Sequence, residues 1–187
     1  MIEIPSDLHP ELVPLAFLLG RWTGAGVHDF PGAEKCNFGQ EVVFTHDGRP
    51  FLEYTSHTWV LDADGKKVRP LENESGYWRI DAERKVDVTT TRDEGVVEIW
   101  TGVLAEGKPQ IDLVTDAVAR LPFAPDYSGG KRLYGYVNSD LMWVGEKSTP
   151  KVPLRPYMSA HLKKVVDPRE WVADLKDLPD DGIAFFK

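Results

Sequence analysis

The stretch that decides the fold is Gly20-Arg21-Trp22-Thr23-Gly24-Ala25-Gly26. Because alternate residues of an extended strand share a face, one face of this segment carries the indole of Trp22 between glycines and is otherwise bare. Glycine inside a strand usually marks tight curvature or the close approach of another group. The segment therefore predicts the opening strand of a small, strongly curved β-barrel.

A short helix is predicted just before this strand, over residues 10–19, by leucines near helical spacing at Leu12, Leu15, Leu18 and Leu19. Gly20 can end this helix, which we expect to cap one end of the barrel. Strand candidates bounded by turn residues fall at residues 19–28, 37–46, 50–61, 74–81, 84–91, 96–104, 109–118, 130–137, 140–148 and 155–165. Their connections are mostly too short for crossover helices, so the sequence predicts an all-β protein, a ten-stranded antiparallel up-and-down β-barrel.

The length of 187 residues suits one well-buried domain. We expect that domain to span residues 1–166, with a C-terminal tail over residues 167–187. Apolar residues of the tail could dock it on the barrel or across a homodimer contact, and a disordered end is the other reading: Trp171, Leu175, Phe185 and Phe186.

Charge and composition exclude several classes of partner. The net charge of −8 argues against nucleic acid and against an anionic membrane surface, since both attract basic proteins. No stretch approaches the roughly 20 apolar residues that span a bilayer, and the N-terminus lacks the regions of a signal peptide, so we expect a cytoplasmic protein. With Cys36 as the sole cysteine, an internal disulfide and a cysteine-based zinc site are excluded.

The chain resembles the nitrobindins, fatty-acid-binding-protein-like barrels that carry ferric haem b, over about residues 10–166. The first strand fits their G-x-W-x-G-x-G signature at every fixed position. The other matching stretches are Gln40-Glu41-Val42-Val43-Phe44, Pro50-Phe51-Leu52, Glu74-Ser75-Gly76-Tyr77-Trp78-Arg79 and Ala160-His161-Leu162. The signature residues are Gly20, Trp22, Gly24 and Gly26.

The resemblance implies one haem b per subunit, with His161 as the axial ligand of the iron and as the catalytic residue. It also implies a contact between Lys131, or Arg132 in its place, and a haem propionate. Gly32 stands where family members commonly have a threonine near the haem, so that hydroxyl is missing here. The implied activity is isomerisation of peroxynitrite to nitrate, with nitric oxide as a further small-molecule ligand.

Strand alternation bears directly on His161. A lone histidine in a strand is more often a surface or hydrogen-bonded residue than a ligand. Met158, Ala160 and Leu162 share one face, so an apolar interior would turn His161 outward. Because ligand-binding barrels can have mixed cavity faces, we nevertheless predict that its ring points inside.

Trp22 is expected to pack in the closed end rather than to line a ligand site. His28, His46 and His57 form no zinc-binding pattern, and most of them are expected at the surface or in hairpins. Two other functions remain open: a barrel that binds a fatty acid or another apolar molecule without catalysis, and a structural barrel filled by its own side chains.

Overall fold

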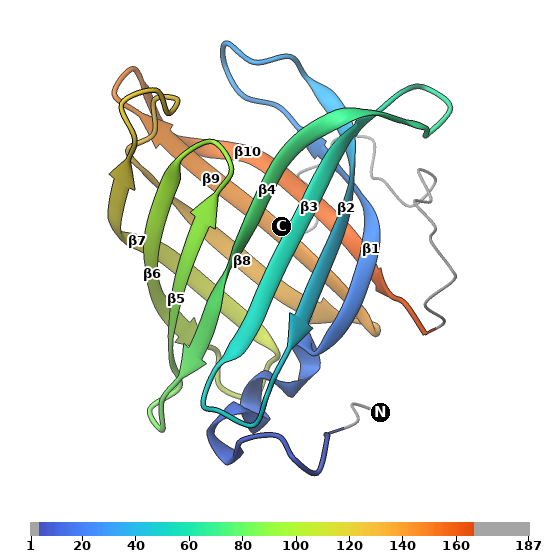
Figure 1. Ribbon diagram of the computed structural model, residues 1–187, viewed down its shortest axis with the longest axis vertical. Helices are drawn as coiled ribbons and strands as arrows, with labels where there is room; N and C mark the ends of the chain where they lie inside the picture. Colours follow the sequence, from blue (N-terminus) through green and yellow to red (C-terminus); the bar gives the residue numbers. More distant parts are fainter. Residues whose placement is uncertain (1–3, 167–187) are drawn as a thin grey trace.

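The chain forms a closed antiparallel barrel in the computed structural model, which describes residues 4–166. Around the barrel the strands follow the order β1-β10-β9-β8-β7-β6-β5-β4-β3-β2, so that every strand pairs with its neighbours in sequence and β1 closes on β10 (Figure 1). The bounds are β1 Gly20–His28, β2 Cys36–Thr45, β3 Leu52–Leu61, β4 Lys67–Ile80, β5 Lys85–Arg92, β6 Val96–Leu104, β7 Gln110–Arg120, β8 Gly129–Val137, β9 Asp140–Thr149 and β10 Val152–Lys164. The predicted ten-stranded up-and-down barrel is confirmed. The predicted tail, residues 167–187, lies outside the described residues.

The largest difference from the predicted strands is at β4, which begins at Lys67 rather than at residue 74. Its first half contains Pro70 and a polar run, which hide the alternation by which a strand is recognised. The pairing of β3 with β4 is irregular there, with register shifts between His57 and Trp59 and between Val60 and Leu61. Such irregularities are typical of barrel rims, where strands bend.

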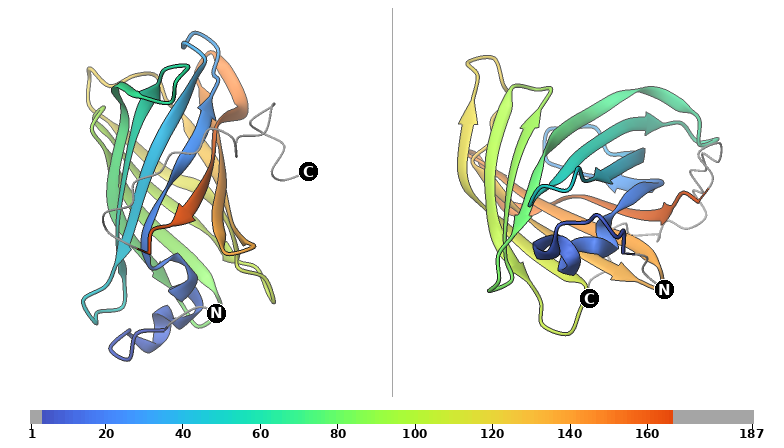
Figure 2. Two further views of the ribbon diagram at one scale, coloured as in Figure 1. Left: turned by 90° about the vertical axis from the view of Figure 1, so that its right-hand side faces the viewer. Right: turned by 60° about the horizontal axis from the view of Figure 1, so that its bottom comes forward.

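The capping helix η1, Pro10–Leu18, lies beneath one end of the barrel (Figures 1 and 2). It is a 3₁₀-helix, and Pro14 within it has no N–H to donate to an α-helical hydrogen bond. Trp22 joins the helix to β1, because its indole Nε1 donates a hydrogen bond of 2.7 Å to the carbonyl oxygen of Leu18. Trp22 is completely buried, so its predicted packing role at the closed end is confirmed.

The glycines of the signature allow β1 to lie very close to its neighbouring strands. A Cβ atom on Gly24 would lie 2.0 Å from the carbonyl oxygen of His161 on β10. A Cβ atom on Gly26 would lie 2.1 Å from the carbonyl oxygen of Ser159 and 2.4 Å from the ring of Phe38 on β2. The barrel therefore closes tightly at this seam because these positions carry no side chain.

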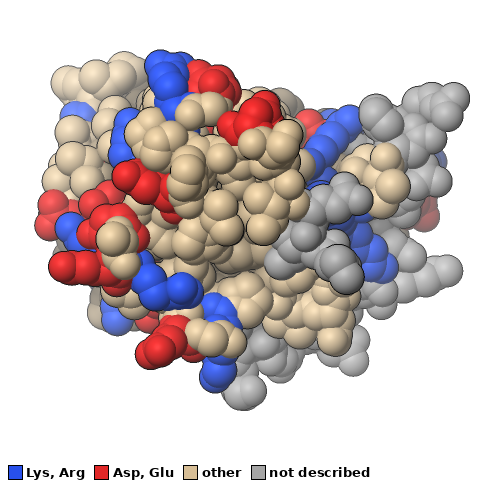
Figure 3. Space-filling model, turned by 90° about the horizontal axis from the view of Figure 1, so that it is seen from below, with Lys and Arg blue, Asp and Glu red and all other residues tan. Residues whose placement is uncertain are grey.

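The interior is graded from apolar at the capped end to charged toward the open end. Leucines of η1 pack with inward-facing aromatic residues of the strands in the main core, including Trp22, Phe44, Trp78 and Trp100. On the outside of the capped end, acidic and basic side chains are interspersed around the edge, and the centre is uncharged (Figure 3). Among the described residues, no helix has the length and apolar character that a membrane span needs.

Candidate functional site

Two buried ion pairs cross the interior above the apolar core. The guanidinium of Arg132 on β8 binds the carboxylate of Glu74 on β4 through two hydrogen bonds, of 2.6 and 2.7 Å. The same guanidinium lies over the ring of Trp100, 4.6 Å from its centroid. Burial by itself raises the pKa of Glu74, but the positive charge of Arg132 outweighs it, and the pKa lies below its usual value. The pair is therefore ionised at neutral pH.

The second pair lies nearer the open end. Arg92 at the end of β5 donates hydrogen bonds of 2.9 and 3.2 Å to the two carboxylate oxygens of Glu98 on β6. The hydroxyl of Tyr127 donates to the same carboxylate, and Thr90 hydrogen-bonds to it from the other side. Both charged side chains are almost completely buried, so their charges are neutralised locally.

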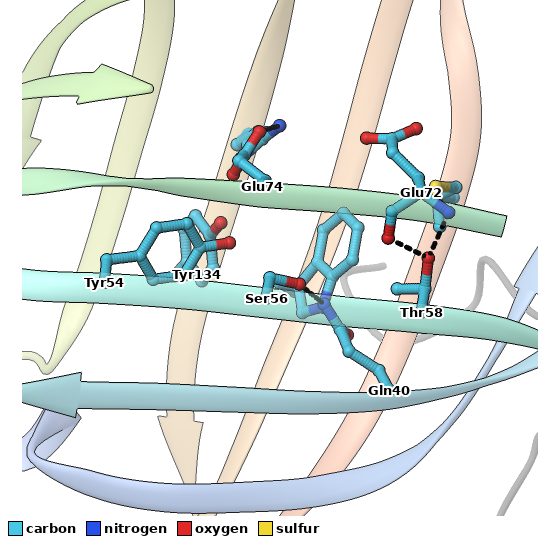
Figure 4. Close-up of a pocket in the computed structure, with 10 residues that line it drawn as sticks. Gln40, Tyr54, Ser56, Thr58, Glu72, Glu74 and Tyr134 are labelled. Carbon is cyan, nitrogen blue, oxygen red and sulfur yellow. Dashed lines mark hydrogen bonds and ion pairs between the residues drawn. The ribbon is translucent and has the colours of Figure 1, made fainter. Parts of the chain in front are cut away.

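A small cavity lies among these groups, and Figure 4 shows the side chains that face it. The space that the centre of a water molecule can occupy is about 20 Å³, which suffices for about one water molecule. Neither an acyl chain nor a porphyrin fits into that volume. Its lining is mostly polar: Gln40, Tyr54, Ser56, Thr58, Glu72, Glu74, Arg132, Tyr134, Trp143 and Met158.

At the open end four inward-facing side chains meet, which we call the mouth group: His28, Phe30, Lys147 and Tyr157. The ammonium of Lys147 lies 4.4 Å from the ring centroid of Phe30 and 4.8 Å from that of Tyr157. The imidazole of His28 meets the ring of Tyr157 edge-on, with 6.3 Å between centroids. An imidazole, a phenol, a cation and an apolar ring are thus gathered at the barrel mouth.

His28 is the last residue of β1 and faces inward, because it shares its face with Trp22, Gly24 and Gly26. Its side chain is buried, and the residue is 8 % exposed. Its Nδ1 atom lies 3.4 Å from the carbonyl oxygen of Glu34. Burial and the nearby charge of Lys147 lower its pKa, so the neutral imidazole is favoured. Of the three histidines expected mostly at the surface or in hairpins, His28 is therefore one that does not lie there.

Tyr157 lies at a register shift of β10, between Pro156 and Met158, where the strand bulges. Its ring occupies space that Gly145 on β9 leaves open, since a Cβ atom there would lie 2.9 Å from a ring carbon. Burial raises the pKa of Tyr157, and the carboxylate of Glu72 acts in the same direction. Burial likewise lowers the pKa of Lys147. The bulge therefore turns an additional aromatic side chain into the mouth.

The structure does not place the ring of His161 inside the barrel, where it was predicted. Its neighbours Ala160 and Leu162 are completely buried in the main core, so His161 projects from the outer wall. It pairs with Ala25, which belongs to a separate cluster with Trp59 and Leu61.

The imidazole of His161 also has a structural partner. Its Nε2 atom lies 2.6 Å from a carboxylate oxygen of Asp140, at the start of β9. Leu162, the next residue, pairs with Gly24 and Leu141, toward the capped end of the barrel. Coordination of an internal haem iron by His161 therefore has no support in this geometry.

Of the other residues predicted near the haem, one points into the barrel and two lie at the surface. Lys131 is exposed and points outward, whereas Arg132, its predicted substitute, points inward and is bound to Glu74. Gly32 lies in the exposed segment between β1 and β2, with a φ of +84°. This positive φ favours glycine, so the backbone explains its presence without any ligand.

Sequence reasoning missed the mouth group because its members are far apart in the chain. The available signal was His28 itself: it continues the alternation of Gly20, Trp22, Gly24 and Gly26, which already defines the inner face. Within residues 4–166 no cluster of three or more His, Cys, Asp or Glu side chains is arranged to hold a bare metal ion.

Comparison with known proteins gives the family. The model of the THAP4-like, heme-binding beta-barrel domain matches residues 11–164. The chain belongs to this haem-binding barrel family. The resemblance to nitrobindins is thereby confirmed.

Relatives within the family carry two different names. A protein of Streptomyces avermitilis, named ferric nitrobindin-like protein, is 78 % identical over 191 residues that cover 100 % of both chains. A protein of Nocardioides sp., named peroxynitrite isomerase, is 45 % identical over 160 residues, covering 86 % of this chain and 96 % of the relative. The crystal structure of Rv2717c from M. tuberculosis is 30 % identical, has a TM-score of 0.77 and covers 85 % of this chain and 99 % of that one.

Haem is the prosthetic group that the family implies, and the residues can be tested against it. The central cavity excludes a porphyrin by its volume, and His161 faces the wrong way. The mouth group does supply suitable donor chemistry, because imidazole and phenolate both serve as axial ligands of haem iron and an ammonium can pair with a propionate. Because His28, Phe30 and Tyr157 are buried, a porphyrin could enter the open end only if these side chains moved.

Proposed function

We propose that this protein binds ferric haem b at the open end of its barrel, with the mouth group as its binding residues. The observation that carries the proposal is the meeting of an inward-facing imidazole, a phenol, a cation and an apolar ring at one end of a barrel of this family. The capped half of the barrel then serves as a rigid, packed base for the site.

Each member of the mouth group has a distinct role in this proposal. His28 and Tyr157 offer the nitrogen and oxygen donors that haem iron accepts. Lys147 would pair with a propionate, an interaction that strengthens in the low dielectric of the mouth. Phe30 would cover a porphyrin face and keep water from it.

Entry of the porphyrin requires the segment between β1 and β2 to yield. Phe30 is buried, but residues 31–35 of this segment are exposed. Exposed connecting segments with few packed side chains open at low cost in free energy. Displacement of the Phe30 ring is therefore the step that uncovers the mouth.

The proposed activity is isomerisation of peroxynitrite to nitrate, which is the activity in the printed name of the Nocardioides relative. When bound, ferric haem would supply the Lewis-acid chemistry that weakens the O–O bond of peroxynitrite. The chain itself would draw the anion through the charge of Lys147 and limit the access of water through Phe30. Nitric oxide is a second small molecule that bound haem would accept.

The proposal is tested by titrating the purified protein with haemin and following the Soret absorbance. We expect saturation at one haem per chain. We expect weaker binding in Lys147→Met, which removes the inward-facing cation, and unchanged binding in the matched variant Lys131→Met, which removes an outward-facing one. A wild-type protein that shows no saturable change in the Soret band would contradict haem binding.

A further inference from the structure

We infer that the C-terminal segment, residues 167–187, docks on the outer wall of its own barrel, around the seam where β1 closes on β10. The surface that it covers, which we call the seam wall, is formed by the outward-facing side chains of Ala25, Trp59, Leu61 and His161. These residues belong to β1, β3 and β10. The inference does not depend on haem and goes beyond the proposed function.

The seam wall is buried although it lies on the outside of the barrel. The outward-facing apolar residues of β6 and β7 are 43–56 % exposed: Val97, Ile99, Val103 and Val114. Ala25, Trp59 and Leu61 face outward in the same way but are only 3–6 % exposed. The side chain of His161 is 13 % exposed. The seam wall is therefore covered, whereas the outer wall of β6 and β7 is not.

Part of this cover comes from the wall itself. The ring of Trp59 lies over Gly39 of β2, where a Cβ atom would be 2.3 Å from the indole Nε1, and it extends to Ala25 on β1. The ammonium of Lys67 lies 3.6 Å from the centroid of the Trp59 ring. The buried residues nevertheless extend from β3 to β10, three strands apart around the barrel. A cover of that width is a segment of chain rather than one side chain.

The C-terminal segment starts beside this wall. The amide of Val165 donates a hydrogen bond of 2.9 Å to the carbonyl oxygen of Arg21 on β1. The following 21 residues, 167–187, can extend over at most about 70 Å. Trp59 on β3 lies three strands from β10, which is about 14 Å across the sheet. The segment can therefore cover the whole seam wall of its own barrel.

The composition of the segment also matches the wall. Its large apolar residues include Trp171, Leu175, Phe185 and Phe186. Such side chains suit an indole and a leucine that face outward. The segment has six acidic and three basic residues. The wall carries the cations Lys67, over the ring of Trp59, and Lys163, on the same face of β10 as His161. Apolar contacts and opposite charges thus favour the same occupant.

The inference is tested with a nitroxide spin label in the middle of the segment of the full chain, at Ala173→Cys, with Cys36→Ser removing the native thiol. The oxidised label broadens the NMR signals of nearby nuclei, and the reduced label does not. We expect the signals of the seam wall to lose intensity when the label is oxidised. Those of the outward-facing residues of β6 and β7 should keep theirs.

A matched pair of variants identifies the contact. Leu61→Asp places a carboxylate under the docked acidic segment and should largely remove the broadening of the seam wall. Val103→Asp makes the same change on the outer wall of β6 and should leave that broadening intact. Because both side chains face outward, neither substitution disturbs the interior of the barrel.

Three outcomes would overturn the inference. The first is a seam wall whose signals keep their intensity beside the oxidised label, and the second is broadening that Leu61→Asp leaves unchanged. The third comes from mixing spin-labelled chains with isotope-labelled chains that carry no spin label. Broadening of the seam wall in that mixture would show that the segment docks on a second copy. None of these results bears on haem binding.

Discussion

At the scale of single residues, the buried ion pair of Glu74 and Arg132 is the feature with the largest energetic consequence. Both side chains are almost completely buried, with exposed fractions of 4 and 6 %. Removal of one partner leaves an uncompensated charge in the interior, which costs far more than the loss of an exposed pair. The pair also fixes β4 against β8 across the width of the barrel.

Glu74→Gln should therefore lower the free energy of unfolding by about 3–5 kcal/mol, because the guanidinium of Arg132 would remain buried without a counter-charge. The matched variant Glu41→Gln breaks a partly exposed pair with Arg21 and should cost about 1 kcal/mol or less. Chemical denaturation of both variants measures the difference. Equal losses would show that the buried pair is not the stronger contribution.

The same carboxylate predicts the response to acid. The pKa of Glu74 is lowered in the folded protein from a usual value of 4.5, so the unfolded chain binds this proton more tightly. Its stabilising contribution is then complete above pH 4.5 and is lost as the pH falls through the folded pKa. We expect the denaturation midpoint of the wild type to fall steeply below that pH, and that of Glu74→Gln to fall less. Parallel profiles would contradict this assignment.

The sequence predicts least well whether an individual side chain points into the barrel or out of it. Alternation along β10 correctly indicates that Ala160 and Leu162 share the inner face, and the structure agrees. The prediction that His161 points inward follows the usual haem ligand of the family and not this alternation. His28 was passed over because its burial depends on the ring of Tyr157, which comes from the far end of the chain.

At the scale of elements, turns and periodicity were sufficient to predict the barrel. Tight turns between alternating runs gave ten strands in sequential order, because a meander has no other simple way to hide its edges. The turns and the periodicity did not predict that β4 starts at Lys67 or that η1 is a 3₁₀-helix. Both depend on prolines, whose effect is decided by tertiary packing.

The seam between β1 and β10 offers a test at this scale. Gly24→Ala places a Cβ atom 2.0 Å from the carbonyl oxygen of His161, so one strand must move and their hydrogen bonds must weaken. We expect a lower melting temperature and faster amide exchange along β1 and β10 than along β5 and β6 on the other side of the barrel. Uniform exchange rates with an unchanged melting temperature would show that the seam tolerates a side chain.

At the scale of the whole molecule, the barrel consists of a packed apolar base and a mouth that carries polar and charged side chains. The base holds the apolar core, sealed by η1, and the ion pairs above it leave space for about one water molecule. In the proposed function, ligand chemistry takes place at the open end, where the mouth group lies. The signature glycines serve closure of the barrel, so they predict the fold without indicating which residues bind a ligand.

The most direct test of this account is a crystal structure of the protein grown with haemin. The account predicts a porphyrin at the open end, with a propionate beside Lys147 and the ring of Phe30 displaced. It also predicts that His161 stays paired with Asp140 on the outer wall. Iron bonded to His161, or a porphyrin lodged away from the mouth group, would contradict it.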